Sequence, residues 1–163
     1  MGFKRFAVFA GKVIAAHVTT YFLAGAVAYQ LLTKEFYVGT HPIFATFMRT
    51  EGEPQLFSHV VRWFLPAQIL RGLLIAAVLY PFFDTLKVWP FVKRWLVIGA
   101  LYIVLGFWAA TVAAPGTLEG MVYLRPFITP EVHLKVQPEI VLQGLALAFL
   151  IAGAMMGTRS REA

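Results

Sequence analysis

One arginine stands inside a segment that is long and apolar enough to cross a membrane. Residues 66–80 read Pro-Ala-Gln-Ile-Leu-Arg-Gly-Leu-Leu-Ile-Ala-Ala-Val-Leu-Tyr, with Arg71 as the charged residue of the run. A cation inside hydrocarbon costs ~2.5–3.5 kcal/mol or more, so it normally faces protein or water and has a partner. Its planar fork of donors suits a carboxylate, another anion or a lipid phosphate. Arg71 is therefore the first candidate for a binding residue.

A later segment repeats this pattern. Residues 138–145 read Pro-Glu-Ile-Val-Leu-Gln-Gly-Leu and match residues 66–73 as Pro-x-x-x-Leu-polar-Gly-Leu, with Gln143 in the place of Arg71. The match favours two related halves, each a hairpin of two membrane helices, as in some transporters. It is also consistent with two unrelated helices that each begin with a proline and need a small residue at a helix contact.

The polar residues of the two segments predict one site. Gln68 and Arg71 are three residues apart, and Glu139 and Gln143 are four apart, so each pair shares one helix face. All four follow closely after the prolines at which their spans are expected to begin, and Gln30 reaches a similar depth. We predict an outward-facing pocket for an anionic ligand around Arg71, formed with Gln68, Gln143, Glu139 and Gln30.

A structural role for Arg71 is the alternative. Its side chain could extend to the lipid headgroups, or it could pair with Glu139 and hold two spans together. In either the structural or the ligand-binding case, we expect contact with Glu139 or Gln143, directly or through one water, because an unpartnered buried charge is costly.

The histidines give weaker signals. His17 lies within a span, and a haem held between helices would need a second ligand such as Met155 or Met156. A buried histidine bonded to a backbone carbonyl or a threonine is the simpler interpretation. The remaining histidines have no tight metal-ligand spacing, so solvated loop residues are favoured over a metal site: His41, His59 and His133.

Composition places the whole chain in a membrane. Of its 163 residues, 60% are hydrophobic and 13% charged, whereas soluble domains have about 45–50% apolar and about 25% charged residues. We predict a single membrane domain over residues 1–163, all-α, with four transmembrane helices in an antiparallel bundle. The connections between spans one and two and between spans three and four form a partly helical extracytoplasmic cap. The predicted spans cover residues 13–32, 67–83, 95–114 and 138–157. Residues 54–65 could lie in the membrane interface as a separate helix, but we favour a near-continuous helix that enters the second span with a kink at Pro66.

The positive charges predict the orientation. Short tails and one tight turn carry a compact group of cations that is typical of cytoplasmic segments. We therefore expect an integral protein of the cell (inner) membrane with both termini in the cytoplasm. Lys12 interrupts the first apolar run, which favours a retained helix over a cleaved signal peptide. The cations are Lys4, Arg5, Lys12, Lys87, Lys93, Arg94, Arg159 and Arg161.

Several functions are excluded or disfavoured. The chain has no cysteine, which excludes disulfides, thiolate metal sites and cysteine nucleophiles. No catalytic set or cofactor motif is recognisable, and nothing indicates nucleic-acid binding despite a net charge of +6. Besides the lipid bilayer, the expected partner is a lipid or an anionic small molecule that the protein binds or transports. The alternatives are an accessory subunit, with a membrane-complex partner or as a homo-oligomer, and a lipid-modifying membrane enzyme.

Overall fold

Four long apolar helices organise the part of the chain that the structure describes. The structure is a computed structural model, and it describes residues 2–40 and 42–156. Four helices within these residues have the length and composition to cross a membrane, and the described residues contain no strand. The predicted all-α membrane fold is thereby confirmed. The four helical stretches are Phe3–Tyr37, Pro54–Val88, Phe91–Trp108 and Pro130–Ala154.

Each of the first two stretches is a nearly continuous helix whose hydrogen-bonding pattern departs from α-helical near one end. The first widens to π-helical turns before its end, and the second tightens to a 3₁₀ turn at Pro81. The first consists of α1 (Phe3–Ala28), η1 (Tyr29–Thr33) and α2 (Lys34–Tyr37), and the second of α3 (Pro54–Leu79), η3 (Tyr80–Phe82) and α4 (Phe83–Val88).

Pro66 does not interrupt α3, so the helix that contains the predicted span 67–83 already begins at Pro54, as the expected near-continuous helix requires. Membrane helices tolerate such prolines because neighbouring groups satisfy the freed carbonyl. The earlier start changes the position of Arg71. It lies about 25 Å along the helix axis from both Pro54 and Val88, where we had expected it within about two turns of the start of its span.

The last two long helices begin near their predicted positions. The third, α5 (Phe91–Ala100) with the π-helical η4 (Leu101–Trp108), ends at Trp108 and not at Ala114. There, Trp108 Nε1 donates a hydrogen bond to Gln137 Oε1 at 2.8 Å, which fixes this helix end beside the start of α8 (Gln137–Ala154). The sequence also has Gly153 and Gly157 four residues apart on the last span, a spacing that favours close helix contact, and Gly157 lies outside the described residues.

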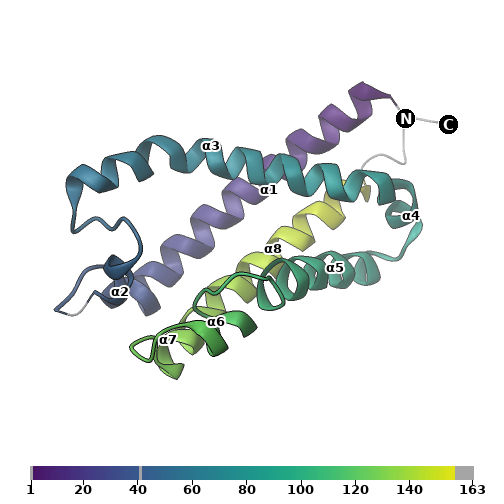
Figure 1. Cartoon of the computed structure of the whole chain (residues 1–163). Helices are drawn as coiled ribbons and strands as arrows, with labels where there is room; N and C mark the ends of the chain where they lie inside the picture. The colour runs from purple at the N-terminus through teal and green to yellow at the C-terminus, as the bar shows by residue number, and fades with distance from the viewer. Residues whose placement is uncertain (1, 41, 157–163) are drawn as a thin grey trace.

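The long helices form a row in the order α3, α1, α8 and α5 (Figure 1). α1 packs against both α3 and α8, and α5 packs against α8. Neighbouring helices in the row run in opposite directions (Figure 1), as predicted for an antiparallel bundle. α3 and α5 occupy the two ends of the row. In the described residues they make no extensive contact with each other.

Two glycines allow the closest helix crossings. A Cβ atom added at Gly72 of α3 would lie 2.8 Å from the Cα atom of Ile14 on α1. One added at Gly144 of α8 would lie 2.4 Å from Ile103 Cγ1 on η4. Both are the glycines of the repeated Pro-x-x-x-Leu-polar-Gly-Leu pattern, and each stands where the two helices of its own half cross. This placement agrees with either interpretation of the repeat.

The two ends of the bundle differ. At one end of the bundle lie the N-terminus of α1, the short helix α4 and the C-terminus of α8. This end is called the turn end. Arg5 forms an ion pair with Asp84 there, and Lys12 Nζ donates to the carbonyl oxygen of Ala154 at 3.5 Å. The main apolar core lies toward this end, where Phe9 and Phe83 meet edge to face with ring centroids 5.1 Å apart.

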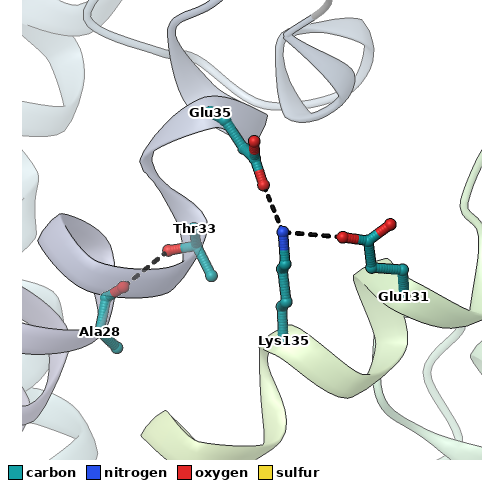
Figure 2. A network of polar contacts seen from close by, with 5 residues as sticks. All are labelled: Ala28, Thr33, Glu35, Glu131 and Lys135. Carbon is teal, nitrogen blue, oxygen red and sulfur yellow. Dashed lines mark hydrogen bonds and ion pairs between the residues drawn. The ribbon is translucent and has the colours of Figure 1, made fainter.

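The opposite end carries the cap, defined as residues 38–53 and 109–136. Its short helices are η2 (Ile43–Thr46), α6 (Leu118–Tyr123) and α7 (Pro130–Lys135). Figure 2 shows how α7 is attached to α2: the Lys135 ammonium lies between two carboxylates, 2.5 Å from Glu35 Oε1 and 2.8 Å from Glu131 Oε1. The cap is therefore tied to the first membrane helix by charge as well as by apolar packing.

Candidate functional site

A cavity of about 650 Å³ lies between α3 and the helix formed by α5 and η4, with α8 and α1 also contributing to its wall. It occupies the space that the open row leaves between its two end helices. Residues from all four membrane helices line it. Its polar lining residues are Tyr21, Arg71, Tyr102, Glu139 and Gln143.

On α3 and α8, the lining residues change from polar to apolar along the cavity. On α8, Glu139 and Gln143 come first, and Leu147 and Ile151 follow toward the turn end. The distance from residue 139 to residue 151 along the helix is about 18 Å. On α3, the apolar lining residues likewise follow Arg71 toward the turn end: Leu74, Ile75, Val78 and Leu79. The cavity is therefore amphiphilic: on α3 and α8 its polar residues stand nearer the cap, whereas η4 contributes the apolar Leu105 and Phe107 on the cap side of Tyr102.

Arg71 is exposed and lines the cavity without an ion pair. Among the described residues, no carboxylate lies within 4.0 Å of its guanidinium, and its side chain makes no hydrogen bond. The structure thus shows neither an ion pair nor a direct hydrogen bond from Arg71 to Glu139 or Gln143 in the described residues, and contact through one water stays a prediction. Arg71 lines the cavity from α3, and Glu139 and Gln143 line it from α8.

Glu139 contributes the opposite charge from another wall. Its Oε1 atom lies 3.4 Å from the position of a Cβ atom added at Gly25, so the carboxylate stands against the backbone of α1. No cation forms an ion pair with it among the described residues. One cavity therefore contains a guanidinium and a carboxylate that do not neutralise each other directly.

Gln143 presents a buried donor at the cavity. Its exposed fraction is 5%, and its Nε2 atom has no hydrogen-bond partner among the described residues. Leaving such a group unsatisfied costs about 1–3 kcal/mol. Gln143 follows Glu139 by one helical turn and faces the same cavity. Its amide is thus available to an acceptor on a bound molecule.

Gln68 has a different role from the one we predicted. It does not line the cavity; its Oε1 atom lies 3.1 Å from His17 Nε2. Since an amide oxygen only accepts, Nε2 must carry the proton and Nδ1 is left as an acceptor. His17 is fully buried, and its Nδ1 atom has no partner among the described residues.

The hydrogen bond of His17 supports the structural interpretation of this residue. We predicted a bond to a backbone carbonyl or a threonine, whereas the partner is the side chain of Gln68. The bond occupies Nε2, one of the two nitrogens that could ligate a haem iron. Met155, the second proposed ligand, is buried in the apolar core near the turn end.

Two tyrosines complete the polar part of the cavity, and the sequence analysis missed them. The ring centroids of Tyr21 and Tyr102 lie 6.0 and 6.4 Å from that of His17. Tyr21 follows His17 by four residues on α1, a spacing that would have indicated a shared face. Tyr102 reaches the site through the packing of η4 on α8, for which the sequence contains no local signal.

Gln30 is separated from the other predicted site residues. It is exposed and borders a second hollow of about 410 Å³ beside Glu35 and Lys135. The widened turns of η1 carry it toward the cap. The structure therefore unites Arg71, Glu139 and Gln143, places Gln68 beside them, and places Gln30 elsewhere.

The cap histidines do not form a cluster in the described residues. His59 is exposed on α3, whereas His133 is buried and accepts a hydrogen bond at Nδ1 from the Gly116 N–H at 2.9 Å. His41 lies outside the described residues. No group of three or more histidine or acidic side chains within residues 2–40 and 42–156 is placed to hold a metal ion.

Comparison with known proteins returns no relative: no family model, curated protein or solved structure matches this chain. The cavity and its lining residues are therefore the basis on which a function is proposed.

Proposed function

We propose that this protein binds a membrane amphiphile, with its polar group at Arg71 and Gln143 and its acyl chain along the apolar part of the cavity. The observation that carries the proposal is the composition of one cavity wall. A guanidinium without an ion pair and a buried amide without a partner stand at one end, and aliphatic side chains continue from them. Those two groups suit a phosphate or a carboxylate.

The dimensions support an acyl chain. Beyond Gln143 the lining of α8 extends over about 12 Å to Ile151, which is most of the hydrocarbon thickness of one bilayer leaflet, about 15 Å. Leu74, Val78 and Leu105 line the cavity and are 58%, 67% and 62% exposed. Because these residues stand at its open side, a lipid chain would enter laterally from the bilayer. Binding is the step that a lipid-binding protein and a lipid transporter share.

Affinity measurements on the purified full-length chain test this proposal. The probe is a single-chain fluorescent phospholipid added to the protein in non-ionic detergent micelles. Arg71→Gln should weaken binding about ten- to hundredfold, since a hydrogen bond to a charged group contributes about 1.5–3 kcal/mol. Arg62→Gln, which removes an exposed arginine of α3 outside the cavity, is the matched control and should leave affinity unchanged. Equal affinity of the wild type and Arg71→Gln would contradict the proposal.

We also propose that the turn end faces the cytoplasm, in the inner membrane of the cell. The described cations of this end stand on the start of α1 and around the turn between α4 and α5, whereas the cap carries most of the acidic residues. Positive residues in short connections favour the cytoplasmic side. The cations are Lys4, Arg5, Lys12, Lys87, Lys93 and Arg94.

Thiol labelling tests the orientation, because the chain has no cysteine of its own. Val122 in the cap and Val88 at the turn end are 72% and 69% exposed. In intact cells, a membrane-impermeant maleimide should label the Val122→Cys variant and spare the Val88→Cys variant until the cells are opened. The reverse pattern would show that the turn end faces outward.

A second role, as a subunit of a larger membrane complex, is favoured by the surface of α6. This short helix lies outside the four candidate spans, yet Leu118, Met121 and Val122 are 62%, 60% and 72% exposed. An apolar surface of this kind suits a protein partner or the membrane interface. Replacement of Met121 and Val122 by Ser should disrupt assembly if α6 binds a partner, while lipid binding at Arg71 is retained.

A further inference from the structure

We infer that the bound amphiphile is zwitterionic, with an anionic group that Arg71 binds and a cationic ammonium group that Glu139 binds. This inference rests on the proposed function and specifies its ligand: a phospholipid whose headgroup contains a phosphate and an amine. The polar end of the cavity is the basis of the inference, because it contains charges of both signs.

The two charges belong to separate helices and do not pair. Arg71 stands on α3 and Glu139 on α8, and both line the cavity. Neither takes part in an ion pair within the described residues. A charge inside a membrane protein is costly unless a partner neutralises it. A molecule that lies between the two residues would serve as the partner of both.

An anion alone does not satisfy this arrangement. A phosphate bound at Arg71 would bring a negative charge into a cavity that already holds the Glu139 carboxylate. An ammonium group on the same headgroup removes this repulsion by pairing with Glu139. The zwitterion therefore matches both charges, whereas an anionic or a cationic amphiphile matches one and is repelled by the other.

The remaining polar residues provide matching subsites. Gln143 supplies a buried amide donor that suits the anionic group. Tyr21 and Tyr102 also line the cavity, and aromatic rings attract an ammonium group through cation–π interaction. A carboxylate and two aromatic rings in one cavity are the groups expected of an ammonium subsite.

The apolar wall assigns the zwitterion to a lipid and not to a soluble molecule. Four aliphatic side chains of α3 continue the wall beyond Arg71, and a soluble headgroup would leave them without a ligand contact. The acyl chain is therefore part of what the site recognises.

A competition experiment with the full-length chain in detergent micelles tests the inference. Two competitors with the same acyl chain displace the fluorescent phospholipid: lysophosphatidylethanolamine, which carries an amine, and its N-acetylated derivative, which keeps the phosphate and lacks the positive charge. The wild-type protein should bind the amine-containing competitor at least tenfold more tightly. Equal or tighter binding of the N-acetylated lipid would overturn the inference. This comparison needs no variant, so it does not depend on the folding of one.

Variants assign the preference to Glu139. Glu139→Gln should remove the preference by weakening the amine-containing lipid at least tenfold while leaving the N-acetylated lipid unchanged or tighter. Glu139→Asp should retain the preference, and Glu53→Gln, which changes an exposed carboxylate at the start of α3, is the matched control. If Glu139→Gln weakened both lipids equally, the ammonium subsite would be refuted.

The outcomes separate this inference from the proposed function. Loss of both lipids in Arg71→Gln, together with no amine preference in the wild type, would uphold amphiphile binding and refute the zwitterion. No binding of either lipid to the wild type would refute both. Soluble phosphoethanolamine should compete at least a hundredfold more weakly than the lipid; equal competition would overturn the assignment to a lipid.

Discussion

Arg71 of α3 and Glu139 of α8 line the same cavity without forming an ion pair with each other. From the sequence we expected Arg71 to contact Glu139 or Gln143, directly or through one water, because an unpartnered buried charge is costly. The open row of helices keeps the two side chains on different walls. This separation distinguishes a binding cavity from a structural ion pair, and it has a measurable energetic consequence.

A double-mutant cycle should find little coupling between these residues. Arg71→Leu, Glu139→Leu and the double variant are compared by equilibrium unfolding in mixed micelles without added lipid. Residues that do not interact directly have additive effects within about 0.3–0.5 kcal/mol. An interaction energy of several kcal/mol would instead show that the two residues pair with each other in the absence of ligand.

The buried hydrogen bond between His17 and Gln68 should stabilise the contact between α1 and α3. His17→Leu removes the donor and leaves the Gln68 oxygen buried without it, which should lower the free energy of unfolding by about 1–3 kcal/mol. Adding Gln68→Leu to that variant should restore much of the loss, because an apolar pair leaves no unsatisfied group. A double variant that is less stable than either single variant would contradict the assigned bond.

The crossing of α1 and α3 depends on the absence of a side chain at Gly72. Gly72→Ala would place a Cβ atom 2.8 Å from the Ile14 backbone, so the helices must separate, at a cost of about 1–3 kcal/mol in unfolding free energy. Gly11→Ala is the matched control on α1, because nothing lies within 4 Å of an added Cβ there. Equal stability of the two variants in thermal unfolding would show that the crossing is looser than described.

Local sequence patterns predicted the helices better than they predicted the site. The long apolar runs required four membrane helices, and the apolar face before Pro66 favoured a helix that continues through the proline, as the structure has it. The end of the third helix at Trp108 depends on its bond to Gln137, which is distant in the sequence, so no local pattern marks it.

Three of the five residues predicted to form one site line the same cavity, and the other two do not. Arg71, Glu139 and Gln143 meet because α3 and α8 border the same cavity. Gln68 turns to α1 instead, since the buried His17 offers it a hydrogen bond. Tyr102 enters the cavity from a helix whose place in the row cannot be deduced from its own residues. The spacing of residues along the sequence indicates which side chains share a face of one helix. Which helix faces pack against each other depends on the tertiary structure.

The central claim, that an amphiphile occupies this cavity, is tested most directly by photo-cross-linking in a reconstituted bilayer. The probe is a phosphatidylethanolamine with a diazirine at the end of one acyl chain, and mass spectrometry identifies the labelled peptides. The account predicts labelling concentrated at residues 74–79 and 147–151, which line the apolar part of the cavity, and loss of this label in Arg71→Gln. Labelling spread evenly over lipid-exposed residues such as Leu31 and Val61, and unchanged in Arg71→Gln, would contradict it.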